Sequence, residues 1–317
     1  MAADKMNAET RAATLRSRWR LLGIAYLAFF AALVVLGSGI ALFGRSHSGE
    51  PAFRLHISLS RGRDHPAETR GPSATVPESV AVFASGAPAT VATKPRIAII
   101  IGGLGVSAKA TAAALASLPP QITLTFVPYA ADVQKWVTLA RQQGHEVLLE
   151  VPMESFDFPD SDPGSHTLRV GAGEEANTER LVWAMTRFNG YTGVTNLLGG
   201  RLLSDSDSLE PVFAYLARRG LLFFDNGIAT HSAAPEVAAR TGVLFAQSSV
   251  SIDSIQTAME IDRELAELEN QSRAHGTASG SGFIYPITLE RVAHWAAGLK
   301  SRGFVLVPAS AIVSAKK

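Results

Sequence analysis

The chain has 317 residues, of which 47% are hydrophobic and 18% charged, and its formal net charge is +1. A chain of this length can bury a large core, and the near-zero charge gives no reason to expect nucleic acid as a partner. There is no cysteine, which excludes a disulfide scaffold and a cysteine-ligated zinc site.

The first 43 residues combine a basic segment with a long uncharged apolar run. Residues 1–20 hold five Lys or Arg side chains against two acidic ones, and residues 21–43 hold no charge. As a helix, the apolar run would be about 34 Å long, enough to cross a hydrocarbon layer of about 30 Å. Because the basic residues precede it, we expect residues 1–20 in the cytoplasm, a single transmembrane anchor at 21–43, and the rest in the periplasm of a bacterium with the anchor in its inner membrane.

The next segment, residues 44–94, changes in composition. Pro, Ser, Ala, Gly and Thr dominate it, and it shows neither the helical nor the strand period. This composition predicts a flexible linker. The sequence therefore divides into a cytoplasmic segment, an anchor, a linker and one folded domain at residues 95–317.

From residue 95 onward, predicted strands and helices alternate. The first strand is RIAIIIGGLG at residues 96–105, which is apolar on both faces and stops at a glycine turn. Such a run suits the interior of a parallel sheet or barrel. Further strands are expected at 122–127, 146–151, 193–196, 221–224, 243–245, 278–283 and 304–307, with helices at 107–118, 131–143, 174–188, 208–219, 254–274 and 289–301. This alternation predicts an α/β fold, a deformed or incomplete (β/α) barrel.

The glycine turn permits two interpretations. Gly103, Gly105 and Ala108 form G-x-G-x-x-A between a strand and a helix, as in dinucleotide-binding folds. That fingerprint also needs an acidic residue at the end of the second strand, where this sequence has Pro128 and Tyr129. A dinucleotide-binding domain is therefore a remote alternative.

The second interpretation comes from a series of segments along the folded domain. In order they read IAIIIxxLG, TFVPYA, GHEVLLEVPME, GSHTL, GVTNLLGGR, RGLLFFD, SID, YPITL and LVPAS. In order and spacing this series, which covers residues 96–310, resembles the divergent polysaccharide deacetylase family. The resemblance implies a deformed β/α barrel similar to carbohydrate esterases. It also implies a divalent metal such as Zn²⁺, held by one Asp and two His, that activates water against an N-acetyl group on a glycan.

The sequence departs from the family pattern at the positions that carry the chemistry. Where the family has two aspartates after its first strand, this chain has Gly102 and Gly103. The two histidines of the pattern correspond to Leu197 and Phe283. None of these side chains can donate a lone pair to a divalent ion. We therefore expect no metal cofactor and a cleft filled by apolar contacts.

Polar side chains remain at the predicted strand ends. Glu154, Asp225 and Asp253 are candidate catalytic residues, because two carboxyls across a cleft could act as an acid/base pair on a sugar. The competing interpretation, which we favour, is that they cap helices, pair with Arg201 and shape loops. The positions expected to line the cleft are Gly102, Gly103, Asn196, Leu197, Arg201, Asn226 and Phe283.

Two classes of function remain open. One is an active deacetylase, or another glycan hydrolase, that uses a non-standard site. The other, which we favour, is an inactive descendant of the same fold that binds an envelope polysaccharide or a protein partner in the periplasm. Both hypotheses place the chain in the carbohydrate metabolism of the cell envelope.

Overall fold

The computed structural model describes residues 94–313 of the chain. The strands are β1 (Arg96–Leu104), β2 (Thr123–Phe126), β3 (Val147–Met153), β4 (Gly193–Leu198), β5 (Leu222–Asp225), β6 (Leu244–Gln247), β7 (Val250–Ser251), β8 (Thr277–Phe283) and β9 (Val305–Val307). The helices are α2 (Ala108–Ser117), α3 (Val133–Gln142), α4 (Glu174–Met185), α5 (Gly200–Leu203), α6 (Ser206–Arg218), α7 (Ala234–Thr241), α8 (Ala258–His275), α9 (Pro286–Leu299) and the 3₁₀ helix η1 (Ala309–Ala311). The anchor expected at residues 21–43 lies outside this range, and within the range no helix is long and apolar enough to cross a membrane.

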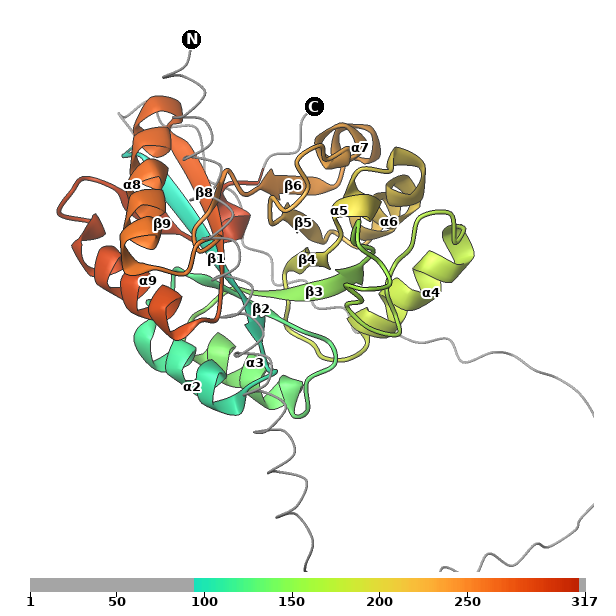
Figure 1. Ribbon diagram of the computed structural model, residues 1–317, viewed down its shortest axis with the longest axis horizontal. Helices are drawn as coiled ribbons and strands as arrows, with labels where there is room; N and C mark the ends of the chain where they lie inside the picture. Colours follow the sequence, from blue (N-terminus) through green and yellow to red (C-terminus); the bar gives the residue numbers. More distant parts are fainter. Residues whose placement is uncertain (1–93, 314–317) are drawn as a thin grey trace, which may run out of the picture. The chain divides into compact units, whose positions relative to one another are not determined.

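All nine strands of the described residues belong to one sheet, in which every pair of strands is parallel. The order is β6-β5-β4-β3-β2-β1-β8-β7, and β9 pairs with the first residues of β1. Figure 1 shows the strands at the centre with the longer helices arranged around them. The sheet curls without closing, because β6 and β7 form its two ends. The predicted incomplete α/β barrel is therefore confirmed.

This strand order does not favour the dinucleotide alternative. In a doubly wound fold the order reverses at a switch point, and helices cover both faces of the sheet. Here β1 to β6 lie side by side in sequence order. The glycine turn also has an internal use, because the backbone N–H of Gly105 donates to Thr111 Oγ1 at 2.9 Å.

The glycine turn at the end of the first strand begins later than expected. Gly102 and Gly103 lie inside β1, and the turn begins at Gly105. The pairing of β1 with β2 shifts register between Ile101 and Leu104, so the regular ladder is interrupted at the two glycines. Gly103 has a φ of 82°, a conformation that residues with a Cβ rarely adopt. The glycines therefore shape the strand end itself.

The two faces of the sheet have different environments. Alternate residues of β1, including Ile99 and Ile101, point outward into the main hydrophobic core. The residue between them, Ile100, points inward and joins a smaller cluster with Leu148 and Phe224. This period of two is what a strand dictates. The inward face is thus apolar in the middle of the curled sheet. A polar site can lie only beyond this cluster, toward the ends of the strands.

The end of the described chain closes the amino-terminal side of the curled sheet. Ala309 is fully buried in the inner cluster, and its backbone N–H donates to Thr123 Oγ1 at 2.9 Å. The backbone N–H of Ser310 donates to the Glu146 carboxylate at 3.1 Å. Arg96 donates to the Ala311 carbonyl at 3.0 Å. This closure leaves the carboxyl ends of the strands as the open side.

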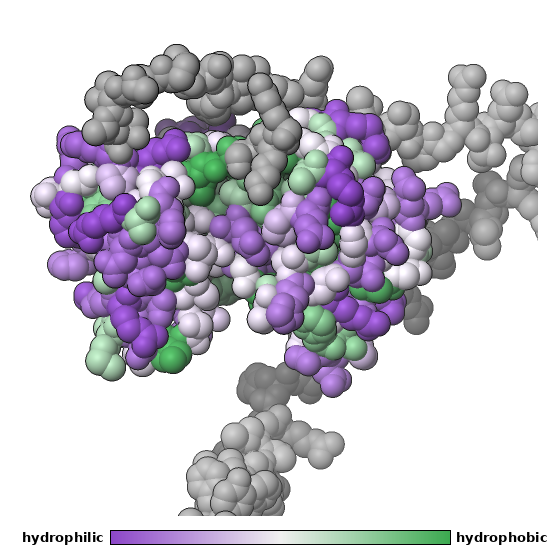
Figure 2. Space-filling model, turned by 90° about the horizontal axis from the view of Figure 1, so that it is seen from above, coloured by the Kyte–Doolittle hydropathy of each residue, from purple (hydrophilic) through white to green (hydrophobic). Residues whose placement is uncertain are grey.

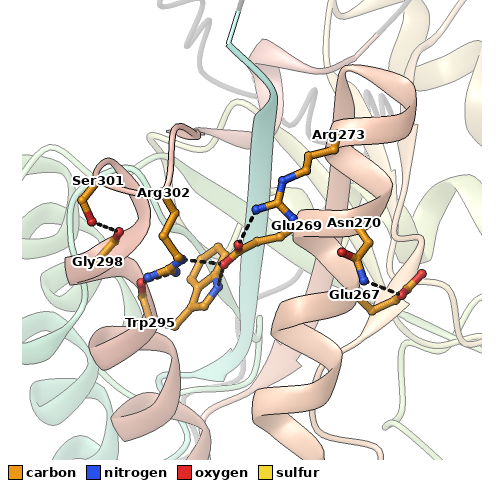
Figure 3. A network of polar contacts seen from close by, with 8 residues as sticks. All are labelled: Glu267, Glu269, Asn270, Arg273, Trp295, Gly298, Ser301 and Arg302. Atoms are coloured by element: carbon orange, nitrogen blue, oxygen red, sulfur yellow. Dashed lines mark hydrogen bonds and ion pairs between the residues drawn. The ribbon is translucent and has the colours of Figure 1, made fainter.

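The outer helices are linked by polar contacts and present polar surfaces. Glu269 of α8 accepts hydrogen bonds from Trp295 Nε1 and Arg302 Nε, each at 2.9 Å, and it pairs with Arg273 at 3.5 Å (Figure 3). On the face shown in Figure 2, hydrophilic side chains predominate and hydrophobic ones are scattered. The contacts of Glu269 join α8 to α9 and to the segment that follows it.

Candidate functional site

A cavity of about 370 Å³ opens at the carboxyl ends of the strands. Its lining comes from β1, β2, β3, β4, β7 and β8 and from the loops that follow β5 and β7. Of the residues that the sequence placed in the cleft or proposed as catalytic, those that line the cavity are Gly102, Asn196, Leu197, Asn226, Asp253 and Phe283. Gly103, Arg201, Glu154 and Asp225 lie outside its lining.

The apolar replacements fill only part of the space. A Cβ on Gly103 would overlap the ring of Phe283, so the ring lies directly over the bare backbone of this glycine. The Phe283 side chain also contacts Tyr285, with ring centroids 5.2 Å apart. The rest of the cavity stays open because Gly102 has no side chain and its neighbours Thr125 and Ser281 are short. The expectation of a filled cleft was therefore wrong for the cavity as a whole.

Glu150 of β3, which is not among the site residues predicted from the sequence, forms the floor of the cavity. The residue is 2% exposed. Its Oε1 accepts hydrogen bonds from Gly103 N and Thr125 Oγ1, each at 2.5 Å. The sequence signal was available, since Glu150 is an acid inside the buried strand VLLEVPM, on the same inward face as Leu148.

Two oxygen atoms at this floor have no hydrogen-bond partner among the described residues. They are Glu150 Oε2 and Thr195 Oγ1, and both are buried. The two residues are paired in register across β3 and β4, so their side chains leave the sheet on the same face. Polar atoms buried without a partner are uncommon in native proteins, and each one calls for an explanation.

Burial changes the acidity of the floor. Desolvation raises the pKa of Glu150 from 4.5 to about 7, although the hydrogen bonds from Thr125 and Gly103 act in the opposite direction. The charged form is disfavoured because the surroundings cannot solvate it as water does. Glu150 therefore changes its protonation state near neutral pH, which an exposed glutamate does not do.

The second carboxyl in the cavity is Asp253. It is 9% exposed, and its Oδ2 accepts hydrogen bonds from Phe283 N at 2.7 Å and Thr288 Oγ1 at 2.8 Å. Burial raises its pKa, while these two hydrogen bonds lower it. Asp253 thus positions the Phe283 backbone and the first turn of α9, and it also contributes negative charge to the lining.

The other two candidate carboxyls have partners elsewhere. Glu154 accepts from Arg201 at 2.9 Å and from Val170 N at 2.7 Å. Asp225 accepts hydrogen bonds within its own loop and from the neighbouring strand, from Gly227 N, Ser232 Oγ and Gln247 Nε2. Burial raises the pKa of Asp225. The structure therefore does not bring Glu154, Asp225 and Asp253 together in one cavity.

Neutral amides form one side of the rim. Asn226 N donates to Asn196 Oδ1 at 3.0 Å, and Asn196 Nδ2 donates to Asn226 Oδ1 at 2.8 Å. These bonds fix β4 to the loop after β5. Ser281 Oγ donates to the Asn226 carbonyl at 2.7 Å. The rim is therefore rigid and polar without being charged.

The residues at the strand ends do not fit the metal that the family pattern implies. Among residues 94–313 no group of three or more His, Asp or Glu side chains could hold an ion. Gly102, Leu197 and Phe283 stand at the positions of the expected ligands. Divalent metal sites in proteins need several N or O donors at one centre. Glu150 and Asp253 supply only carboxylates to this cavity, and they do so from different sides of it.

The similarities to known proteins agree with the sequence motifs. Residues 99–313 match the family model described as divergent polysaccharide deacetylase. An uncharacterized protein of Haemophilus influenzae is 24% identical over 194 residues, which are 61% of this chain and 68% of that protein. The uncharacterized protein YibQ of Escherichia coli K12 is 25% identical over 195 residues, which are 61% of this chain and 60% of that protein.

Solved structures show the same fold. A crystal structure of an uncharacterized protein from Agrobacterium tumefaciens C58 is 36% identical, with a TM-score of 0.69, and the match covers 71% of this chain and 92% of that one. A putative cellobiose-phosphate cleavage protein from Enterococcus faecalis V583 has a TM-score of 0.51 at 9% identity, over 70% of this chain and 100% of that one. The second likeness shows the fold alone.

Proposed function

The chain belongs to the divergent polysaccharide deacetylase family, and from this premise we propose that it has lost metal-dependent hydrolysis and binds a cell-envelope glycan in the cavity at the strand ends. One observation carries the proposal. Gly102, Leu197 and Phe283 replace the expected metal ligands, yet a cavity of about 370 Å³ remains beside them. Loss of the ion without loss of the cavity favours binding over metal-assisted catalysis.

The chemistry of the lining supports a sugar as ligand. Asn196 and Asn226 offer amide groups at the rim, and Phe283, which is 37% exposed, lines the same cavity. Sugars combine hydroxyls with apolar ring faces, so they match neutral hydrogen-bonding groups next to an aromatic side chain. Among the described lining residues none is Lys, Arg or His, which disfavours a phosphate or another anion.

The surroundings of the cavity support an extended ligand. Large hydrophobic side chains are exposed in the loops that follow several strands: Val106, Tyr129, Phe156, Ile228 and Ile255. Exposed hydrophobic residues that gather on one side of a molecule mark a binding surface. A polymer would contact such loops as well as the cavity, whereas a free monosaccharide would not. A periplasmic protein is the alternative partner for the same loops.

We extend the proposal to location. Residues 21–43 would anchor the chain in the inner membrane, with residues 1–20 in the cytoplasm and the folded domain in the periplasm. The support is the length of the uncharged run and the basic residues before it, because positive charge is retained on the cytoplasmic side. In this position the domain would meet envelope polysaccharide.

Calorimetric titration of the purified chain with Zn²⁺ and with N-acetylated chitooligosaccharides tests the proposal. We expect heat from the sugar and no stoichiometric binding of the metal. An Asn226→Ala variant should weaken sugar binding by about tenfold, since it removes an amide at the rim. The matched control, Asn270→Ala on the exposed face of α8, should bind as the unaltered chain does. Tight binding of Zn²⁺ would overturn the loss of the metal site.

A second candidate function, glycan hydrolysis without a metal, has one observation in its favour. Glu150 and Asp253 are two carboxyls in the same cavity, and burial raises the pKa of both. Glycosidases use such a pair, one protonated and one ionised. Mass spectrometry of glycans incubated with the chain would decide between the two functions. Release of acetate or of shorter sugars that disappears in Glu150→Gln would establish hydrolysis.

A further inference from the structure

We propose that the floor of the cavity is a subsite for a primary amine, such as the ammonium group of an amino sugar, with Glu150 Oε2 and Thr195 Oγ1 as its acceptors. The inference rests on the proposed glycan function and specifies which chemical group of the glycan the cavity takes. Its basis is the pair of buried oxygen atoms that have no partner among residues 94–313.

These two atoms are placed to share one ligand group. Glu150 and Thr195 are in register on adjacent strands and both line the cavity. The other carboxylate oxygen, Oε1, is already held by Gly103 N and Thr125 Oγ1, which fixes the orientation of the carboxyl group. Oε2 is therefore the acceptor that remains for a ligand, and leaving a buried acceptor without a donor is unfavourable.

The charge of the donor favours an amine over a hydroxyl. An ammonium group has three N–H donors, so it can satisfy Glu150 Oε2 and Thr195 Oγ1 together and retain a third. A sugar hydroxyl can also meet both atoms, by donating to Glu150 Oε2 and accepting from the Thr195 hydroxyl, but it leaves the charge of the carboxylate uncompensated. A carbonyl has no donor, and it could approach only a protonated Glu150. A hydrogen bond between an ammonium and a carboxylate is also stronger than a neutral one.

The charge of the cavity lining also favours a positively charged ligand group. Its lining holds Glu150 and Asp253, and the described lining residues include no Lys, Arg or His. No basic residue of the lining neutralises these carboxylates, so a positively charged ligand group would do so. An opposite charge within a few ångströms stabilises the ionised form of a buried carboxyl.

Gly102 provides the room for this group. A Cβ placed on Gly102 would lie 2.9 Å from Glu150 Oε1 and 3.7 Å from Cδ2 of Phe283. The missing side chain thus leaves a space between the carboxyl group and the aromatic ring. Cations are attracted to aromatic faces as well as to carboxylates. The glycine that removes a metal ligand of the family pattern therefore opens a space for a cation of another kind.

The test compares three tetrasaccharides at pH 7 by calorimetry with the full chain. They are the glucosamine tetrasaccharide, its N-acetylated counterpart and cellotetraose, which differ in the group that reaches the floor. We expect the glucosamine tetrasaccharide to bind at least tenfold more tightly than the other two. Glu150→Gln should remove this preference, because the amide keeps the size of the side chain but presents a donor in place of Oε2. Thr195→Val should reduce it about fivefold.

Controls separate the subsite from general attraction and from unfolding. Glu210→Gln removes one negative charge from an exposed ion pair with Arg240, and it should leave the preference unchanged. Thermal unfolding checks that each variant is folded. Equal binding of all three sugars would overturn the amine subsite but not the glycan function. The same holds if the acetylated sugar binds more tightly and Glu150→Gln does not change that preference. Absence of binding by all three would overturn both.

Discussion

Glu150 lowers the stability of the folded protein as the pH rises. Its pKa in the folded state is about 7, above the ordinary value of 4.5, so between these pH values the folded state holds a proton that the unfolded state has released. The free energy of unfolding therefore falls as the pH rises from about 4.5 to about 7. Since one pKa unit corresponds to about 1.4 kcal/mol, the full loss is about 3 kcal/mol above pH 7 and vanishes at low pH.

Glu150→Gln should abolish this pH dependence. The amide does not ionise, so the difference in unfolding free energy between variant and unaltered chain should shift in favour of the variant by about 3 kcal/mol from pH 4 to pH 8. Urea denaturation at both pH values measures this difference. Glu210→Gln, at an exposed ion pair, should show no such change. Parallel pH profiles for the unaltered chain and Glu150→Gln would contradict the assignment.

Gly103 is required for two separable reasons, its backbone conformation and the ring above it. Its φ is 82°, and a Cβ there would overlap the ring of Phe283. We expect Gly103→Ala to lower the free energy of unfolding by about 1–3 kcal/mol. In a Phe283→Ala background the same change should cost less, because only the conformational cost remains. A double-mutant cycle by denaturation measures the coupling, and strict additivity would show that the ring does not matter.

At the scale of elements, the segment of β9 and η1 closes the inner cluster of the sheet. Ala309 is fully buried there, whereas Ala311 is exposed. Ala309→Asp would place a carboxylate among Ile100, Leu148 and Leu222, and we expect a loss of about 3 kcal/mol or more. Ala311→Asp makes the same substitution two residues later and should change stability by less than about 0.5 kcal/mol. Equal thermal shifts for the two variants would show that η1 does not close the core.

The contact between α8 and α9 depends on one buried carboxylate. Glu269 is 8% exposed and meets Trp295, Arg302 and Arg273, while Glu267 on the same helix is exposed (Figure 3). Glu269→Ala leaves the indole N–H and a guanidinium without their acceptor, so we expect a loss of about 2 kcal/mol. Glu267→Ala is the matched control and should lower the free energy of unfolding by about 0.5 kcal/mol or less. Guanidinium denaturation of the two variants measures the difference, which the assignment requires to be large.

The limits of prediction also differ between elements. Buried strands such as 96–104 were predictable because a short apolar run that ends at glycine is typical of a buried strand. Helix α7 (Ala234–Thr241) was missed because it is short and its first turn contains Pro235. Helix α8 was expected from Ser254, yet it begins at Ala258, where Thr257 caps the N–H of Glu260. Local capping decides such boundaries, and apolar periodicity does not record it.

For the whole molecule, sequence motifs predicted the family, which the family match confirms, but they did not predict the character of the cavity. Glu154 was visible because it follows a strand, whereas Glu150 lies inside one and was read as part of the apolar run. Its importance depends on Thr195 and Gly103, which come from other strands. Such a juxtaposition arises only when the sheet is assembled, because parallel neighbours are far apart in sequence.

Attachment to the membrane is a property of the whole chain. If residues 21–43 span the bilayer, the full chain should remain in the membrane fraction after washing with high salt and alkaline carbonate, and detergent should release it. Replacing Ala32 and Val35 by Arg should release the chain without detergent, because each Arg near the centre of a span costs about 2.5–3.5 kcal/mol. The same two charges at Ala81 and Val82, within the predicted linker, provide the control and should leave the chain bound. Release of the unaltered chain by salt alone would refute the anchor, whereas protection of the folded domain from protease added outside the inner membrane would reverse the predicted orientation.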